Sequence, residues 1–138
     1  MDNNQIKTLV KSALEARTAS YSPYSGFRVG AALLTADGEI FKGCNVENSG
    51  HSGTCCAERT AVLKAVSEGR RNFVAITVTG GPDSGPVADC YPCGVCRQVL
   101  SEFCGDDFVV IVAESEDKWR KFTLGQLFPH RFGEDVLK

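Results

Sequence analysis

The sequence contains no concentration of basic residues and no long apolar run. Its 15 lysine and arginine residues are scattered and are outnumbered by 17 acidic residues, which gives a formal net charge of −2. Proteins that bind nucleic acids usually carry a basic patch, because contacts with phosphates supply much of their affinity. No apolar run approaches the roughly 20 residues of a membrane-spanning helix. We therefore expect no nucleic-acid partner, no membrane partner and a small, uncharged substrate.

An apolar leader is also missing. The first residues, Met1 to Gln5, are polar, unlike those of a signal peptide. Without export, the odd number of cysteines, seven, favours a metal site over a disulfide framework. We therefore expect a cytoplasmic protein. No repeat, linker or low-complexity segment divides the chain, so residues 1–138 should form a single domain with its own hydrophobic core.

Helical and strand-like patterns alternate along the chain. Apolar residues recur at helical spacing from Ile6 to Leu14, with Asn3 or Asn4 as the expected N-cap. The expected strands are 27–35, 39–45, 73–79, 108–113 and 119–122, and the further helices are 55 or 56 to 66 (capped by Thr54), 93–103 and 124–128. Residues 80–86, rich in glycine and proline, should form a loop. Strands separated by helices, with an apolar and therefore central strand at 108–113, indicate an α/β fold whose sheet is covered on both faces.

Two short segments contain the parts of a metal site. Cys56-Ala57-Glu58 supplies a thiol and a carboxylate, and Cys93 and Cys96 supply two thiols one helical turn apart. Both segments begin expected helices, whose N-terminal partial positive charge stabilises thiolates. Three protein ligands leave the fourth tetrahedral position of zinc free for water, as in catalytic sites. We therefore predict one zinc ion per chain, bound by Cys56, Cys93 and Cys96, with Glu58 placed to exchange protons with that water.

Two other kinds of metal site remain open from the cysteine pattern. A structural zinc site would recruit Cys55 or Cys90 as a fourth ligand, but such a site has no need of Glu58. Cys90 and the next two cysteines also have the C-x2-C-x2-C spacing of an iron–sulfur protein, although Cys104 lies too far along and lacks the following proline. The cysteines outside the site are expected to be small buried apolar residues: Cys44, Cys55, Cys90 and Cys104.

Two arginines stand close to the candidate ligands. Three thiolates give a zinc site a net negative charge, which opposes the activation of water. Arg59 follows Cys56 by three residues, and Arg97 follows Cys93 by four. We therefore expect each guanidinium to donate to a ligand sulfur and withdraw charge from the metal, rather than to be a solvated surface group.

Three further segments surround these residues: 22–32 (SPYSGFRVGAA), 44–48 (CNVEN) and 56–61 (CAERTA). With the cysteines they resemble the short-form cytidine deaminases, from about Tyr21 to Phe132. The resemblance implies a three-layer α/β/α fold with a mixed five-stranded sheet. It implies zinc-dependent hydrolysis of cytidine and deoxycytidine to uridine and deoxyuridine plus ammonia, a reaction of pyrimidine salvage. Glu58 would carry protons to the cytosine ring, as its counterpart does in zinc deaminases generally.

The resemblance also implies a set of substrate-binding residues: Phe27, Asn45, Glu47, His51, Ala57 and Phe132. Asn45 and Glu47, two residues apart at the end of an expected strand, would leave the same side of it and hold the sugar hydroxyls. Phe27 would pack against the pyrimidine, although a core position fits this residue type equally well.

The resemblance implies a homotetramer in which residues of one subunit complete the site of its neighbour. Two of these positions would do so. Phe132 would complete an adjacent site. His51 stands where the family usually has a tyrosine that reaches the neighbouring sugar, so the sugar preference stays open.

Several other functions compete with this interpretation. The alternative substrate is another cytosine compound, such as a nucleoside antibiotic, which the Asn45–Glu47 pair disfavours. Editing of RNA or DNA is disfavoured by the lack of basic and aromatic stripes. A non-catalytic metal-binding module is the remaining alternative.

Overall fold

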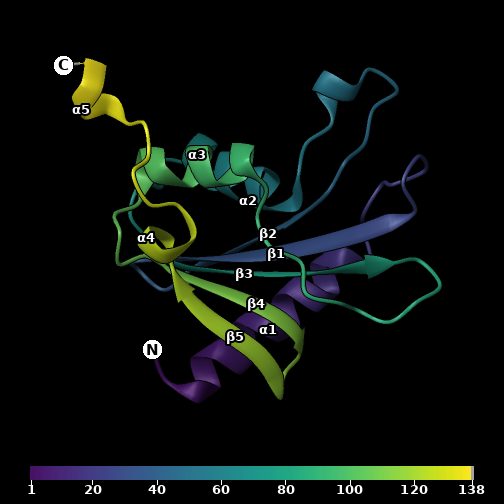
Figure 1. Ribbon diagram of the computed structural model, residues 1–138. Helices are drawn as coiled ribbons and strands as arrows, with labels where there is room; N and C mark the ends of the chain where they lie inside the picture. The colour runs from purple at the N-terminus through teal and green to yellow at the C-terminus, as the bar shows by residue number, and fades with distance from the viewer. Residues whose placement is uncertain (138) are drawn as a thin grey trace.

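A mixed five-stranded sheet forms the centre of the computed structural model, which describes residues 1–137 (Figure 1). The strands lie in the order β2 (Ile40–Cys44), β1 (Phe27–Thr35), β3 (Phe73–Pro82), β4 (Val109–Ser115) and β5 (Lys118–Thr123). β1 is antiparallel to both β2 and β3, β3 is parallel to β4, and β5 is antiparallel to β4. The expected mixed five-stranded sheet is therefore confirmed.

Helices cover both faces of this sheet. α1 (Asn3–Arg17) packs on one face, where Ile6 and Val10 contact Ile111 of β4. α2 (Ala57–Ser67) and α3 (Gly94–Phe103) lie on the other face (Figure 1), and their apolar residues share one core with β1, β3 and β4. The described part of the chain contains three further short helical segments: a 3-10 turn at His51–Gly53, α4 (Leu124–Leu127) and α5 (Glu134–Leu137). The three-layer α/β/α architecture is thus confirmed.

The direction of the strands determines where α2 and α3 begin. β2 and β3 are both antiparallel to β1, so they run in the same direction, and β3 and β4 are parallel as well. The helices α2 and α3 therefore connect parallel strands and pack on the same face. Because each helix follows the carboxyl end of a strand, the first residues of α2 and α3 approach one another at the carboxyl ends of β2 and β3.

Two expected helix caps are wrong. Asp2, not Asn3 or Asn4, caps α1, because its carboxylate accepts from Gln5 N (2.8 Å) while Gln5 Oε1 accepts from Asp2 N (3.0 Å). This reciprocal pair satisfies two backbone donors at once, which a single asparagine cap does not. Thr54 does not cap α2 either: its hydroxyl accepts from Asn48 N, and Cys56 occupies the N-cap position.

Strand β3 is longer than expected, because residues 80–82 belong to it and not to the loop. They pair with the start of β1, where Phe27 lies opposite Pro82. The glycines allow close packing there: a Cβ atom on Gly81 would lie 2.6 Å from Pro86 O. Pro82 is tolerated because it ends the strand. β3 is the third of the five strands. β4, which was expected to be central, is an interior strand with β3 on one side and β5 on the other.

The predicted strand at 27–35 is confirmed with the same bounds, and the other predicted elements differ from the observed ones by a few residues at their ends. The prediction did not include α5 or the 3-10 turn. Within residues 1–137, none of the helices has the length and apolar character needed to cross a bilayer.

Glycines set the distance between the layers. A Cβ atom on Gly30 of β1 would lie 2.6 Å from Arg17 N and would overlap the Ala13 carbonyl oxygen of α1. A Cβ atom on Gly43 of β2 would likewise lie 2.5 Å from Ala61 N of α2. In both places a helix backbone rests directly on a strand backbone.

Gly30→Ala is expected to destabilise the fold by about 1–3 kcal/mol, because the helix backbone must move away to make room for the methyl group. Urea denaturation measures the change. Gly105→Ala is the matched control, since a Cβ atom there would meet only the Asp107 side chain at 3.4 Å. Equal midpoints for the two variants would show that α1 does not rest on Gly30 in solution.

Candidate active site

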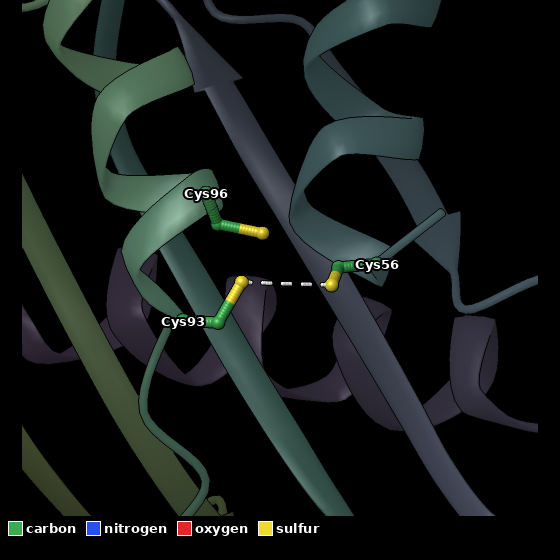
Figure 2. A group of neighbouring side chains, drawn as sticks. All are labelled: Cys56, Cys93 and Cys96. Atoms are coloured by element: carbon green, nitrogen blue, oxygen red, sulfur yellow. Dashed lines mark hydrogen bonds between the residues drawn. The ribbon is translucent and has the colours of Figure 1, made fainter. Parts of the chain in front are cut away.

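Three cysteine sulfurs meet where α2 and α3 begin (Figure 2). Cys56 is the N-cap residue of α2, Cys93 is the N-cap residue of α3, and Cys96 lies in the first turn of α3. Their Sγ atoms all lie within 4.8 Å of one another, and the Cys56 and Cys93 Sγ atoms are 3.7 Å apart. Tetrahedral zinc with Zn–S bonds of about 2.3 Å requires sulfurs roughly 3.8 Å apart. The donor set therefore fits zinc, and the predicted grouping is confirmed.

Cys55 and Cys90, the two candidates for a fourth zinc ligand, do not belong to the sulfur group found among the described residues. The Cys55 thiol lies 3.7 Å from the Cys56 carbonyl oxygen and accepts a hydrogen bond from Thr60 Oγ1 at 3.5 Å. Cys90 is partly buried, and this burial raises the pKa of its thiol to about 12. Three protein ligands, rather than four, are typical of catalytic zinc sites.

Hydrogen bonds to its sulfur lower the pKa of the Cys56 thiol. The Cys96 thiol and the Arg59 guanidinium donate to it and lower its pKa to about 5. The pKa of Cys96 is raised, because its thiol donates to Cys56 and is buried. The Arg59 Nη2 atom lies 3.4 Å from Cys56 Sγ and also donates to the Thr54 carbonyl at 3.2 Å. Arg59 thus makes the contact with sulfur that its spacing predicted.

Arg97 has different partners from those expected. Its guanidinium donates to the backbone carbonyl groups of Pro92 (Nε, 2.8 Å) and Leu127 (Nη1), not to a ligand sulfur. Because Pro92 precedes Cys93, Arg97 ties the segment before this cysteine to α4. Arg97 therefore contacts the backbone next to Cys93 and not its sulfur, an arrangement that spacing from Cys93 alone did not predict.

Glu58 lies buried beside the sulfurs, with 4% of its surface exposed. Burial raises the pKa of its carboxyl group to about 7. A group with this pKa can both accept and donate a proton near neutral pH, as general acid–base chemistry requires. Ala57, the neighbouring first residue of α2, is fully buried.

The Asn45 side chain is buried and joins three segments. Its Oδ1 atom accepts from the Ser20 hydroxyl and from Val29 N (2.9 Å), and its Nδ2 atom donates to Phe27 O (2.8 Å). An amide oxygen has two acceptor sites and an amide nitrogen has two hydrogens. One N–H donor of Asn45 is therefore left for another partner.

The Glu47 carboxylate closes the turn that precedes β1. Its Oε1 atom accepts from Tyr24 N (3.0 Å) and Ser25 N (3.1 Å), and its Oε2 atom accepts from the Ser25 hydroxyl. These bonds hold the pKa of Glu47 below its ordinary value, with the Ser25 hydroxyl as the largest cause. The carboxylate is thus held ionised and in a fixed orientation.

His51 lines a pocket of about 370 Å³ together with Glu47 and four other residues: Tyr24, Ser25, Asn48 and Thr54. Phe27, at the start of β1, is 36% exposed, so its ring is not a core residue. Phe132 is 53% exposed, and its carbonyl oxygen accepts from Gln98 of α3 (3.0 Å).

Sequence reasoning missed the serines that support this site. Ser20 and Ser25 donate to the side chains of Asn45 and Glu47, but neither serine has a spacing that marks it as a functional residue. The prediction that the four spare cysteines are buried is confirmed for Cys104 but is wrong for Cys44, Cys55 and Cys90, which are partly exposed.

Comparisons with known proteins agree with this geometry. A family model described as the cytidine and deoxycytidylate deaminase zinc-binding region matches residues 3–112. A cytidine deaminase of Sporosarcina psychrophila is 45% identical over 132 residues, 96% of this chain and 94% of that protein. A blasticidin-S deaminase of Bacillus cereus is 35% identical over 134 residues, 94% of each. The crystal structure of a cytidine deaminase from Burkholderia pseudomallei superposes with a TM-score of 0.81 at 42% identity, covering 91% of this chain and 97% of that one.

Replacing any cysteine of the three-sulfur group by alanine is expected to abolish stoichiometric zinc binding, since two sulfurs cannot form this site. Cys55→Ala and Cys90→Ala are the matched controls and should keep about one zinc per chain. Elemental analysis of the purified proteins measures the difference. A Cys90→Ala protein without zinc would show that the ligand set is different.

Proposed function

The chain belongs to the cytidine and deoxycytidylate deaminase family, and on this basis we propose that it hydrolyses cytidine and deoxycytidine to uridine and deoxyuridine with release of ammonia. One observation carries the proposal: the buried carboxyl group of Glu58 interacts with Cys56 and Cys96, two members of the three-sulfur group. A structural zinc site or an electron-transfer site has no use for such a carboxylate.

Zinc held by Cys56, Cys93 and Cys96 would supply the Lewis acidity that makes water nucleophilic at neutral pH. Glu58 accepts a proton from the water as the water oxygen adds to C4 of cytosine, and delivers this proton to N3. Glu58 then takes the remaining proton from the new C4 hydroxyl group and passes it to the exocyclic amino group, so that the C4 carbonyl forms, the C4–N bond breaks and ammonia leaves. Arg59, through its bond to Cys56 Sγ, withdraws negative charge from the sulfurs.

Hydrogen-bond capacity indicates how the sugar would be held. Asn45 has one free N–H donor, and the Glu47 carboxylate, with about four acceptor sites, already uses three. A sugar hydroxyl would therefore accept from Asn45 and donate to Glu47. Phe27, with its ring partly exposed at the start of β1, would pack on the pyrimidine, and Ala57 would lie beside the ring.

We also propose a homotetramer whose sites are completed by neighbouring subunits. Exposed apolar side chains on α2, α3 and the C-terminal segment support this: Leu63, Val95 and Phe132 are each more than half exposed. His51 and Phe132 would contribute to adjacent sites. Light scattering of the purified protein distinguishes a tetramer from a monomer.

The proposed setting is pyrimidine salvage in the cytoplasm. All seven cysteines are free, and three of them must stay reduced to bind zinc. A reducing compartment preserves such thiols.

A second candidate function is the deamination of another cytosine compound. The similarity to a blasticidin-S deaminase favours it, because that protein is named for a different substrate and covers nearly the whole chain. The two functions differ in whether a sugar hydroxyl is recognised by Glu47.

Glu58→Gln is expected to lower the turnover of cytidine by at least about 10²–10⁴-fold, the usual contribution of a general acid–base group. The zinc content should stay unchanged, because Glu58 is not a ligand. The fall in ultraviolet absorbance as cytidine becomes uridine measures the rate, and elemental analysis measures zinc. A wild-type protein that binds zinc but leaves cytidine unchanged would refute the proposed function. Loss of zinc in the variant would instead assign Glu58 to the metal.

Glu47→Gln is expected to lower kcat/KM for cytidine by roughly 10- to 100-fold, because a hydrogen bond to a charged group contributes about 1.5–3 kcal/mol. The loss should be far smaller for 3′-deoxycytidine, which lacks the hydroxyl that would donate to Glu47. The measurement is a double cycle of two proteins and two substrates. Equal losses on both substrates would show that Glu47 does not bind the 3′-hydroxyl and would favour another cytosine compound as the substrate.

A further inference from the structure

The residues just before Cys93 are connected to β5 and α4. Tyr91 lies two residues before Cys93, and its ring packs edge-on against Phe122 of β5, with centroids 5.7 Å apart and planes at 60°. The Tyr91 hydroxyl accepts from Arg120 Nη1 at 3.1 Å. Arg120 also pairs with Asp89, with its Nη2 atom 3.6 Å from Asp89 Oδ2.

Hydrogen bonds of Arg97 connect the same segment to α4, independently of the Tyr91 contacts. The Pro92 carbonyl accepts from Arg97 Nε (2.8 Å), and Arg97 is bound in turn to the carbonyl of Leu127 in α4. The two residues immediately before Cys93 are therefore fixed to consecutive elements, β5 and α4, neither of which provides a zinc ligand.

Cys93 is the ligand for which such support matters most. It is the exposed member of the three sulfurs, whereas Cys96 is buried and Cys56 is partly buried. Cys56 has Arg59 beside its sulfur, and Cys96 lies within α3. As the N-cap residue of α3, Cys93 is held by the chain that precedes it, in a segment without regular structure between Asp89 and Cys93.

We infer that Tyr91, held by Phe122 and Arg120, is a positioning residue that keeps Cys93 on the metal and so sets the rate at which zinc is lost. The inference rests on the proposed function, since it takes zinc as the occupant of the three sulfurs. Outer partners of metal ligands commonly change metal affinity or activity by about 10–100-fold. The ring contact should dominate, because the Arg120–Asp89 pair is exposed and such pairs contribute little.

The test measures the release of zinc from the loaded protein to an excess of a chromophoric chelator without denaturant. Tyr91→Ala is expected to release zinc roughly 10–100-fold faster than wild type. Tyr91→Phe keeps the ring and should stay within about threefold of wild type, since one exposed hydrogen bond is worth little. Lys118→Gln is the matched control, because it removes an exposed ion pair of β5 with Glu114 and should release zinc at the wild-type rate.

Phe122→Leu tests the same contact from β5 if Tyr91→Ala does not fold, and it should also release zinc faster. Urea curves for each variant establish that the native state is populated during the release measurement. In the zinc-saturated proteins, Tyr91→Ala should lower kcat for cytidine with little change in KM when the rate is expressed per folded, zinc-bound chain. A loss of overall stability would reduce the amount of folded protein and leave this normalised kcat unchanged.

Wild-type release rates in Tyr91→Ala and Phe122→Leu would overturn the inference. So would equally fast release in Lys118→Gln, since that result would mean that any weakening of β5 has the same effect. Both outcomes leave the deaminase proposal intact. A wild-type protein that binds no zinc would instead overturn the proposed function, and this inference with it.

Discussion

One zinc ion can hold three sulfurs only if they lie roughly 4 Å apart, and in this chain they come from two different helices. The sheet meets this constraint through the direction of its strands. β2 and β3 run the same way because both are antiparallel to β1, so α2 and α3 start at the same edge. Gly30 and Gly43 then fix how far the helical layers stand from the sheet. The position of Glu58 follows from the same arrangement, since it lies in the first turn of α2.

Asn45 and Glu47 are positioned by a different interaction, a short pairing between two loop segments. Tyr21 and Val46 form a parallel bridge, with Tyr21 N bound to Asn45 O (3.0 Å) and Glu47 N bound to Tyr21 O (2.8 Å). This bridge aligns the turn before β1 with the segment after β2. Asn45 and Glu47 can therefore reach the serines and backbone amides that orient them. Groups fixed in this way lose little conformational entropy when they bind a ligand.

Much of this could be predicted from the sequence, because its signals are local. The grouping of the three cysteine sulfurs and the contact of Arg59 with Cys56 follow from spacing along two helices, and the strand at 27–35 follows from a mainly apolar segment. The failures involve contacts between distant segments. The partner of Arg97 in α4, 30 residues away, leaves no trace in local spacing. The extension of β3 through residues 80–82 depends on pairing with β1, which overrides the loop-forming tendency of glycine and proline.

The direct contact between the α2 backbone and Gly43 also restricts how chain length can vary. Side chains alternate along a strand, so one residue inserted within β2 before Gly43 would place a side chain where only hydrogen fits. The exposed turn between β4 and β5 carries no such restriction. Related chains should therefore differ in length at that turn and not within β2. This gives a geometric reason for where gaps belong when such sequences are aligned.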